Sequence, residues 1–450
     1  MLPPFVVAGL LFAASVSALD SDWYAPAYTE TQEAIYLLAT EDVYVRPDHF
    51  SDGPTTPLQV QAQITKALEP HVQVRIMVQP GTGQQKSFVQ ELERIHANYP
   101  SDNITFLEVV HCDIWTRDTG PIWLKRSLGA NTSTKSGTGN MTLRDVVSTR
   151  MMVQPVFTLW GYNVGGHVRG PWASCDVPNR VPQQLSPLLG IPYTSSQYAT
   201  EGGDKSFNGR GSVVMNKAVE LQRNPNMSLS SIEALAKEEL HVRHVVWTEQ
   251  GVSDDDQSFR GPLDGAGGVR VYTPIGTGGH VDEFARFVGP RTVVLARVNE
   301  RQRKTSPIAA ETHKRLERDY QLLLQQKDQD GQPLQVVRMP FPDELVLTVN
   351  RTESVYDQLA QLPELNLTGS TAPINIVLAA SYTNYVIAND VILLPNYYKP
   401  GRPKYMLETD NQALATMQAL FPDRSIVQIN PEPVNAGGGG LNCITNNQPA

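Results

Sequence analysis

Strand-like and helix-like hydrophobic patterns alternate along the whole 450-residue chain, with no linker of disorder-like composition between them. Apolar residues at every second position predict a strand over 72–78, and those of 88–95 then recur at helical spacing. The pattern of 316–324 indicates another helix, and 373–380 and 385–395 indicate strands. Because the two periods mix throughout, the sequence predicts the α/β class.

The same patterns predict a single domain over residues 19–450, with inserted loops near 126–150 and 355–372. Within it, Ser230 and Glu233 have the spacing of a capping box, which predicts the start of a helix there. A strand is expected to follow over 241–247.

The charge balance limits the partners. The chain has 37 Lys and Arg against 46 Asp and Glu, which gives a formal net charge of −9. Nucleic acid is therefore not expected as a partner, because neutralising phosphates requires a basic surface. A negative surface concentrates cations, so the balance suits a cationic substrate.

The N-terminal residues 2–18 are uncharged and mostly apolar, and the run is too short to span a bilayer comfortably. Val16-Ser17-Ala18 places small residues where a signal peptidase cleaves, although Lys and Arg are missing before the run. We expect a signal peptide over 1–18 and a secreted, extracellular protein with no membrane partner. The alternative is a buried hydrophobic segment.

Glycosylation motifs agree with export. Six sites fit Asn-x-Ser/Thr and are predicted to carry glycans in an exported chain: Asn103, Asn131, Asn140, Asn226, Asn350 and Asn366.

The chain has only three cysteines, Cys112, Cys175 and Cys443, which excludes a small disulfide-framed domain. In an oxidising compartment an odd count leaves at least one thiol unpaired. That thiol is either a buried inert group, an intermolecular link, or a reactive nucleophile with the other two cysteines paired.

Four polar clusters lie far apart in the sequence: Trp115–Pro121, Glu201–Asp204, Gly278–Glu283 and Gly437–Thr445. Taken singly, each has a structural explanation, such as a turn. His280 and Asp282 have the spacing of half a metal site, but no His-rich partner accompanies them. We therefore expect no metal.

Taken together, the clusters supply a Cys, a His and several carboxylates. A Cys/His pair suits nucleophilic attack, with the His as general acid and base. A cysteine peptidase would need an oxyanion hole rather than a group of negative charges. Carboxylates beside the nucleophile suit a planar cation, and a guanidinium, with five N–H donors, fits best.

The motifs WTRDTGP, EGGD, GGHVDEFARF and GGGGLNCIT, in this order, resemble the agmatine deiminase-like peptidylarginine deiminase family, of the pentein superfamily. The resemblance runs from about residue 25 to 450. It implies the pentein fold, an α/β-propeller of five pseudo-symmetric ββαβ-type units with the site in a central channel. It also implies a mechanism without a cofactor.

The resemblance implies roles for five residues. Cys443 matches the nucleophile, His280 the general acid and base, and Glu201 the acid that orients the His. Asp118 and Asp282 match the carboxylates that clamp the guanidinium. The mechanism that the resemblance implies has three steps. The thiolate attacks the guanidinium, ammonia leaves, and water hydrolyses the covalent thiouronium intermediate.

Further substrate contacts are implied at three positions. Asn384 falls where the family has a polar residue near the site. Trp160 belongs to a segment that resembles the aromatic patch of agmatine-specific members, and Trp115 opens the first motif.

The expected function is a secreted deiminase that converts peptidyl arginine to citrulline and ammonia. The alternatives are agmatine deiminase, which yields N-carbamoylputrescine, and a deiminase of free arginine. A catalytically silent binding protein of the same fold is disfavoured, because the motif residues are all present.

Overall fold

The computed structural model describes residues 22–96, 99–127, 148–164 and 180–450. The predicted signal peptide, Asn131, Asn140 and Cys175 lie outside the described residues. Within them, no helix is long and apolar enough to span a bilayer.

Two four-stranded sheets hold most of the first half of the chain together with its last strand. The first contains β21 (Asn446–Pro449), β2 (Gln32–Leu38), β3 (Gln73–Val78) and β4 (Ile104–Glu108), with helices α1 (Pro57–Leu68) and α2 (Gln84–Ile95) between its parallel strands. The second contains β1 (Trp23–Tyr24), β5 (Ile122–Arg126), β6 (Arg150–Val156) and β7 (Tyr193–Ala199), with α4 (Val181–Leu189) before β7.

Three three-stranded sheets follow. They are β8 (Ser206–Phe207), β9 (Ser212–Asn216) and β10 (His244–Thr248); β13 (Ala285–Phe287), β14 (Thr292–Arg297) and β15 (Gln335–Pro340); and β18 (Val386–Ala388), β19 (Val391–Pro395) and β20 (Ser425–Ile429). The helices that link their parallel strands are α5 (Lys217–Arg223), α6 (Leu229–Glu239), α7 (Glu300–Thr305), α8 (Pro307–Gln325) and α10 (Lys404–Leu420).

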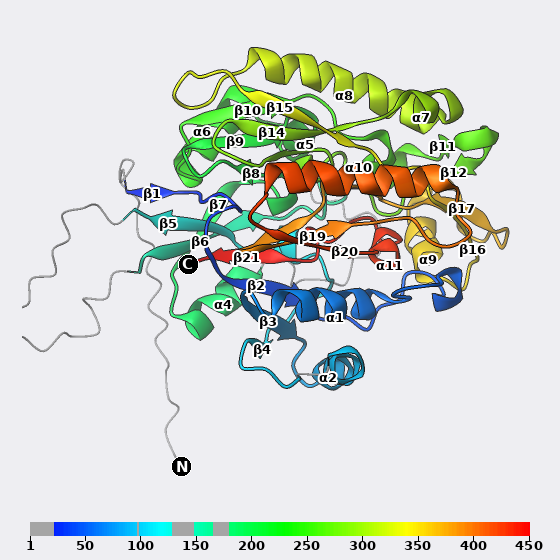
Figure 1. Ribbon diagram of the computed structural model, residues 1–450, viewed down its shortest axis with the longest axis horizontal. Helices are drawn as coiled ribbons and strands as arrows, with labels where there is room; N and C mark the ends of the chain where they lie inside the picture. The colour runs from blue at the N-terminus through cyan, green and yellow to red at the C-terminus, as the bar shows by residue number, and fades with distance from the viewer. Residues whose placement is uncertain (1–21, 97–98, 128–147, 165–179) are drawn as a thin grey trace, which may run out of the picture.

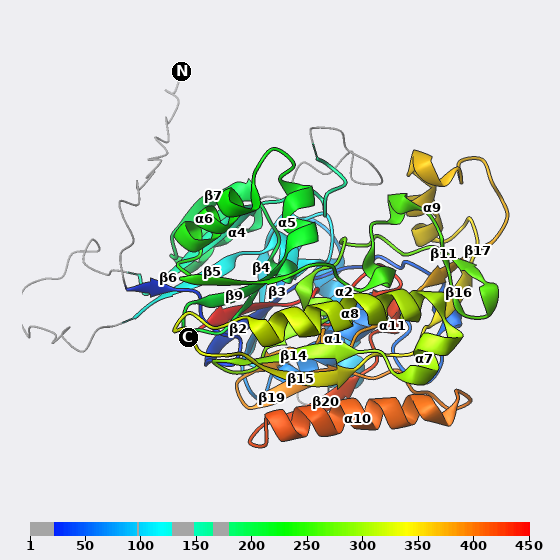
Figure 2. The ribbon, with the colours of Figure 1, turned by 90° about the horizontal axis from the view of Figure 1, so that it is seen from above.

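One connection recurs in these five sheets. Each contains an antiparallel pair, and one strand of that pair leads through a helical segment into a parallel neighbour. The helices lie on the outside: α8 runs along the top of Figure 1, and α10 lies at the lower edge of Figure 2. The interior is left to loops and strand ends.

Shorter elements complete the fold. They are the hairpin β11 (Leu263–Asp264) and β12 (Arg270–Val271); the pair β16 (Val346–Val349) and β17 (Ile374–Val377), with α9 (Ser354–Ala360) between them; the one-turn helices α3 (Thr116–Thr119) and α11 (Glu432–Asn435); and the 3-10 turns η1 (Pro47–His49), η3 (Gly202–Asp204), η4 (Ser253–Asp255), η5 (Ser258–Arg260), η6 (Ala266–Gly268), η7 (Val281–Glu283) and η8 (Pro363–Leu365).

Local sequence explains the positions of several elements. The predicted strand at 72–78 is β3, and the apolar residues of 88–95 form the inner face of α2, where Phe88 and Leu92 are fully buried. The turn between β18 and β19 is at Asn389, whose φ of 48° suits an Asn.

The predicted capping box at Ser230 and Glu233 is wrong. The N-cap of α6 is Ser228, whose side chain accepts from the Ser231 amide over 3.1 Å. Three serines in four positions offered equivalent caps, and the helix begins two residues earlier than expected.

Candidate active site

Cys443 lies between α11 and β21 and is 4 % exposed. It is a free thiol, whereas Cys112 is disulfide-bonded. The glycine run before it allows close packing, because a Cβ on Gly439 would lie 3.0 Å from the Cys443 sulfur and 2.6 Å from the Trp115 ring. The loop thus brings backbone, indole and thiol into contact, which a side chain at Gly439 would prevent.

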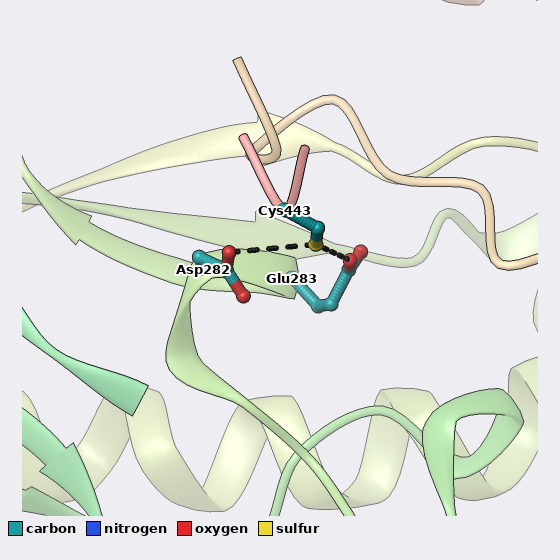
Figure 3. Close-up of side chains that lie close together, drawn as sticks. All are labelled: Asp282, Glu283 and Cys443. Carbon is teal, nitrogen blue, oxygen red and sulfur yellow. Dashed lines mark hydrogen bonds between the residues drawn. The ribbon is translucent and has the colours of Figure 1, made fainter. Parts of the chain in front are cut away.

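The Cys443 sulfur lies between two carboxylates (Figure 3). Sγ is 3.7 Å from Asp282 Oδ2 and 3.6 Å from Glu283 Oε1. The Asn384 Nδ2 group donates to Sγ over 3.1 Å and to Glu283 Oε1 over 2.9 Å. Burial, together with the negative charges of Asp282 and Glu283, raises the pKa of the Cys443 thiol well above its ordinary value.

His280 is held by its backbone. Asp255, in η4, accepts hydrogen bonds from the amides of Thr277, Gly279 and His280, at 2.7, 3.1 and 3.2 Å. Asp204 accepts from the next amide, that of Val281, over 3.2 Å. Two buried carboxylates therefore fix the loop, which leaves the imidazole itself to other partners.

The imidazole lies between two acids. Its Nε2 is 3.3 Å from Glu201 Oε2, and its Nδ1 is 3.8 Å from Asp118 Oδ1. Burial favours the neutral ring, but the charges of Asp118 and Glu201 outweigh it and raise the pKa of His280 to about 9. The ring is thus a cation at neutral pH, able to act as an acid.

Glu201 remains ionised because Arg223 faces it. The Arg223 Nε lies 2.9 and 3.1 Å from the two carboxylate oxygens. Burial opposes ionisation, but this ion pair and His280 overcome it and lower the pKa of Glu201 to about 2. Arg223 also donates to the Thr277 carbonyl over 2.5 Å, so it joins Glu201 to the His280 loop.

Asp118 is oriented by two donors. Oδ2 accepts from the Trp160 indole N–H over 2.8 Å, and Oδ1 accepts from the Gly203 amide over 2.8 Å. Burial raises the pKa of Asp118 above its usual range. Trp160 has a φ of 52°, which is rare for a bulky residue and marks a strained backbone beside the site.

Asp282 lies in η7 and is 1 % exposed. Its Oδ2 accepts from the Asn442 side chain over 2.8 Å. Its Oδ1 has no hydrogen-bond partner among the described residues. A buried carboxylate oxygen left in this state is available to a donor from a ligand.

A small pocket opens beside the thiol. Its lining is Trp115, Asp118, Trp160, Ile275, Thr277, Gly438 and Cys443. The Trp115 and Trp160 rings meet edge to face at 6.3 Å. The cavity has a volume of about 10 Å³, far below the range of about 300–1,000 Å³ typical of drug-sized ligands. The pocket thus combines an aromatic wall, a carboxylate and a thiol around a small volume.

The sequence profile of the Porphyromonas-type peptidyl-arginine deiminase family matches residues 25–265 and 267–449. The chain belongs to this family. Agmatine deiminase from Pseudomonas fluorescens is 27 % identical over 434 residues, covering 95 % of this chain and 96 % of that protein. Agmatine deiminase from Pseudomonas putida KT2440 is 26 % identical over 434 residues, with the same coverage.

Solved structures show the fold. Agmatine deiminase of Enterococcus faecalis superposes with a TM-score of 0.67 at 23 % identity, covering 95 % of this chain and 96 % of that one. A C. jejuni agmatine deiminase variant with substrate bound gives 0.63 at 16 % identity, covering 95 % and 96 %. The α/β pentein fold expected from the sequence is therefore confirmed, and this deiminase is a hydrolase of amidine C–N bonds.

The structure brings the residues expected from the motifs together. Seven of them line the pocket or contact a residue that lines it: Cys443, Asp118, Trp115, Trp160, His280, Asp282 and Asn384. Glu201 lies one contact further away, against His280. Of the predicted glycosylation sites, Asn103, Asn226, Asn350 and Asn366 are exposed.

Sequence reasoning missed four residues of the deiminase site. Glu283 is next to Asp282 in the His-Val-Asp-Glu cluster, so its position was a usable signal. Asn442 similarly precedes the cysteine. Asp255 and Arg223 had no signal, because they act through contacts that only the folded chain creates.

Proposed function

We propose that this deiminase hydrolyses agmatine, a small alkylguanidine with a distal ammonium group, to N-carbamoylputrescine and ammonia. The observation that carries the proposal is the composition of the pocket beside Cys443. Its described lining includes a carboxylate and two indoles but no cationic side chain. An alkylguanidine without a carboxylate suits such a lining, and two relatives named agmatine deiminase support the same substrate.

Free arginine suits the pocket less well. Its α-carboxylate needs a cationic partner, and the arginines buried near the site, Arg117, Arg223 and Arg286, already have partners. Arg117 donates to the Asn442 and Asn447 side chains at 3.1 and 2.6 Å. Arg223 is paired with Glu201.

Peptidyl arginine, the substrate first expected from the sequence, becomes the second candidate. In a peptide the α-carboxylate of arginine is part of an amide bond. The absence of a cationic side chain from the pocket lining therefore does not exclude this substrate. The names of the relatives nevertheless favour agmatine.

In the proposed mechanism, Asp118 and Asp282 hold the guanidinium by charge-assisted hydrogen bonds. The cation offsets the negative charges that raise the pKa of the Cys443 thiol, so binding favours loss of the thiol proton to solvent. The thiolate then attacks the central guanidinium carbon, which gives a neutral tetrahedral adduct. Substrate binding and activation of the nucleophile are thus one event.

His280 carries out the proton transfers. As a cation it protonates one amino group of the adduct, the C–N bond breaks, and ammonia leaves a thiouronium cation on Cys443. The neutral imidazole then takes a proton from water, which attacks the same carbon. The hydroxyl proton of this second adduct passes to solvent as the C–S bond breaks, so the neutral ureido product departs and the thiolate is restored.

A substrate panel tests the choice. We expect kcat/KM for ammonia release from agmatine to exceed that from free arginine and from a peptide with internal arginine by tenfold or more. A higher value for the peptide would assign the enzyme to peptidyl arginine. No release from any of the three would contradict the deiminase mechanism.

We also propose that the enzyme is exported and glycosylated. The uncharged segment 2–18, the disulfide at Cys112 and the exposed acceptors Asn103, Asn226, Asn350 and Asn366 support this. The test is expression of the full chain in a eukaryotic secretory host. The medium should contain a protein that begins after Ala18 and loses mass on endoglycosidase treatment. Retention of the N-terminus inside the cell would contradict export.

The shared ββαβ order of five sheets supports a further structural proposal, that they are pseudo-symmetric units around one axis. Superposing the unit of β8, β9 and β10 on that of β13, β14 and β15 tests it. A rotation of about one fifth of a turn is expected between neighbouring units.

A further inference from the structure

The trio Asp282, Glu283 and Cys443 has a second chemical capacity besides nucleophilic attack. One ligand-type atom from each residue lies within 4.8 Å of the others, and all three residues are buried. Within the described part of the chain, this is the only such group that includes three or more His, Cys, Asp or Glu side chains.

We propose that Cys443, Asp282 and Glu283 form an inhibitory site for a thiophilic divalent cation, with Zn²⁺ as the ion of best fit. Occupancy would block the thiol that the proposed function uses as its nucleophile. The metal binding itself does not depend on which guanidine is the substrate.

Distances support a tetrahedral ion. A Zn²⁺ at about 2.3 Å from a thiolate and about 2.0–2.2 Å from a carboxylate oxygen separates the two ligands by about 3.5–3.7 Å. The two sulfur-to-oxygen distances are 3.7 Å to Asp282 and 3.6 Å to Glu283. Both carboxylates face the sulfur in Figure 3, and the three ligand atoms lie within 4.8 Å of one another.

Neighbouring amides hold the carboxylate ligands in place. Asn442 donates to Asp282 Oδ2 over 2.8 Å, and Asn384 donates to Glu283 Oε1 over 2.9 Å. Such donors orient ligands in established metal sites. Each oxygen retains a further lone pair, so the hydrogen bonds and a metal bond are compatible.

Among the described residues, neither Asp282 nor Glu283 is hydrogen-bonded to a cationic side chain. Asp282 is almost fully buried, and its Oδ1 has no partner among the described residues. The nearby cation His280 is engaged by Glu201 and Asp118. A substrate guanidinium supplies one positive charge, whereas a divalent metal supplies two.

Ligand type selects the ion. Mg²⁺ and Ca²⁺ prefer six or more oxygen ligands, which this trio does not provide. A thiolate favours Zn²⁺ among the common divalent ions. Three protein ligands leave a fourth position for water, and the Cys443 proton passes to solvent when the thiolate binds the metal.

Titration calorimetry of the full enzyme with ZnCl₂, without substrate, tests the site. We expect one Zn²⁺ per chain, a loss of that binding in Cys443→Ala, and a Kd at least tenfold higher in Glu283→Gln. The matched control is Asp319→Asn, because Asp319 is an equally buried acid in α8 with an unpartnered Oδ2. It should bind Zn²⁺ as the wild type does, and MgCl₂ should give no binding.

Alkylation provides an independent readout. Zn²⁺ should slow the reaction of iodoacetamide with Cys443 in the wild type by tenfold or more, and much less in Glu283→Gln with an unchanged circular dichroism spectrum. Binding that persists in Cys443→Ala, or equal Kd values for wild type and Glu283→Gln, would overturn the proposal. If the enzyme binds Zn²⁺ in this way but does not hydrolyse agmatine, only the proposed substrate is contradicted.

Discussion

His280 Nε2 lies 3.3 Å from Glu201 Oε2, inside a protein interior that both side chains share without solvent. Glu201 is kept ionised by Arg223, so it presents a negative charge to the imidazole. Burial alone would favour a neutral ring, but with Asp118 this contact makes His280 a cation at neutral pH. The acid–base behaviour of the site therefore depends on a pair of residues that are far apart in the sequence.

The first prediction concerns the pH dependence of turnover. Because the pKa of His280 is about 9, kcat should fall on the alkaline side near that pH, as the acid that protonates the leaving ammonia is lost. Glu201→Gln removes one of the raising charges and should move this limb to lower pH. A kcat profile from pH 6 to 10 measures both. If the alkaline limb of the kcat profile lies at the same pH in Glu201→Gln as in the wild type, a group other than His280 titrates there.

The second prediction concerns stability. The folded pKa of His280, about 9, exceeds the ordinary value of 6.5, so the protonated ring stabilises the fold fully below pH 6.5. This contribution is lost as pH rises from 6.5 through 9. The urea midpoint of the wild type should fall across that window, and that of His280→Gln should fall less. Parallel curves for the two proteins would contradict the assignment.

The third prediction concerns the thiol. Cys443→Ala should abolish ammonia release, because the other described cysteine, Cys112, is disulfide-bonded. Cys112→Ala should lower the unfolding temperature while the folded fraction keeps its turnover. Ammonia assays on both variants, corrected for folded protein, make the comparison. Residual turnover in Cys443→Ala would exclude a covalent thiouronium.

The fourth prediction concerns the two aspartates. Asp118→Asn or Asp282→Asn removes one charge from the guanidinium clamp, and losing one member of a buried charged pair costs about 2–5 kcal/mol. We expect kcat/KM to fall by roughly 30-fold to 1,000-fold or more, with an unchanged circular dichroism spectrum. Trp160→Phe, which deletes the indole donor to Asp118, should cause a smaller loss.

The fifth prediction concerns the glycine loop. Gly439→Ala places a methyl group 3.0 Å from the Cys443 sulfur and 2.6 Å from the Trp115 ring, so either the loop or the indole must move. Activity should fall by at least tenfold. Gly289→Ala is the control, because its methyl group would approach Thr292 only to 3.8 Å. Equal activities for both variants would show that the loop tolerates displacement.

Periodicity located α2 and β3 because their apolar faces are buried against the same core, so local pattern and packing agree. It misplaced the start of α6 because Ser228 and Ser230 are chemically equivalent as caps, and only the path of the incoming chain decides between them. The motif residues could be found because they cluster in the sequence.

Arg223 and Asp255 could not be found in that way. Arg223 sets the pKa of Glu201, and Asp255 holds the backbone of His280. Both contacts join residues more than 20 positions apart, and neither leaves a local trace.

The strand β21, which follows Cys443, pairs antiparallel with β2, and Tyr36 donates to Gln448 across 412 residues. During synthesis, β2 leaves the ribosome hundreds of residues before its partner exists, and contacts this distant in sequence form late. We therefore expect the thiol to meet Asp282 and Asn384 late in folding, when β21 docks on β2. A chain that lacks this last segment should release no ammonia, even where its other sheets have folded.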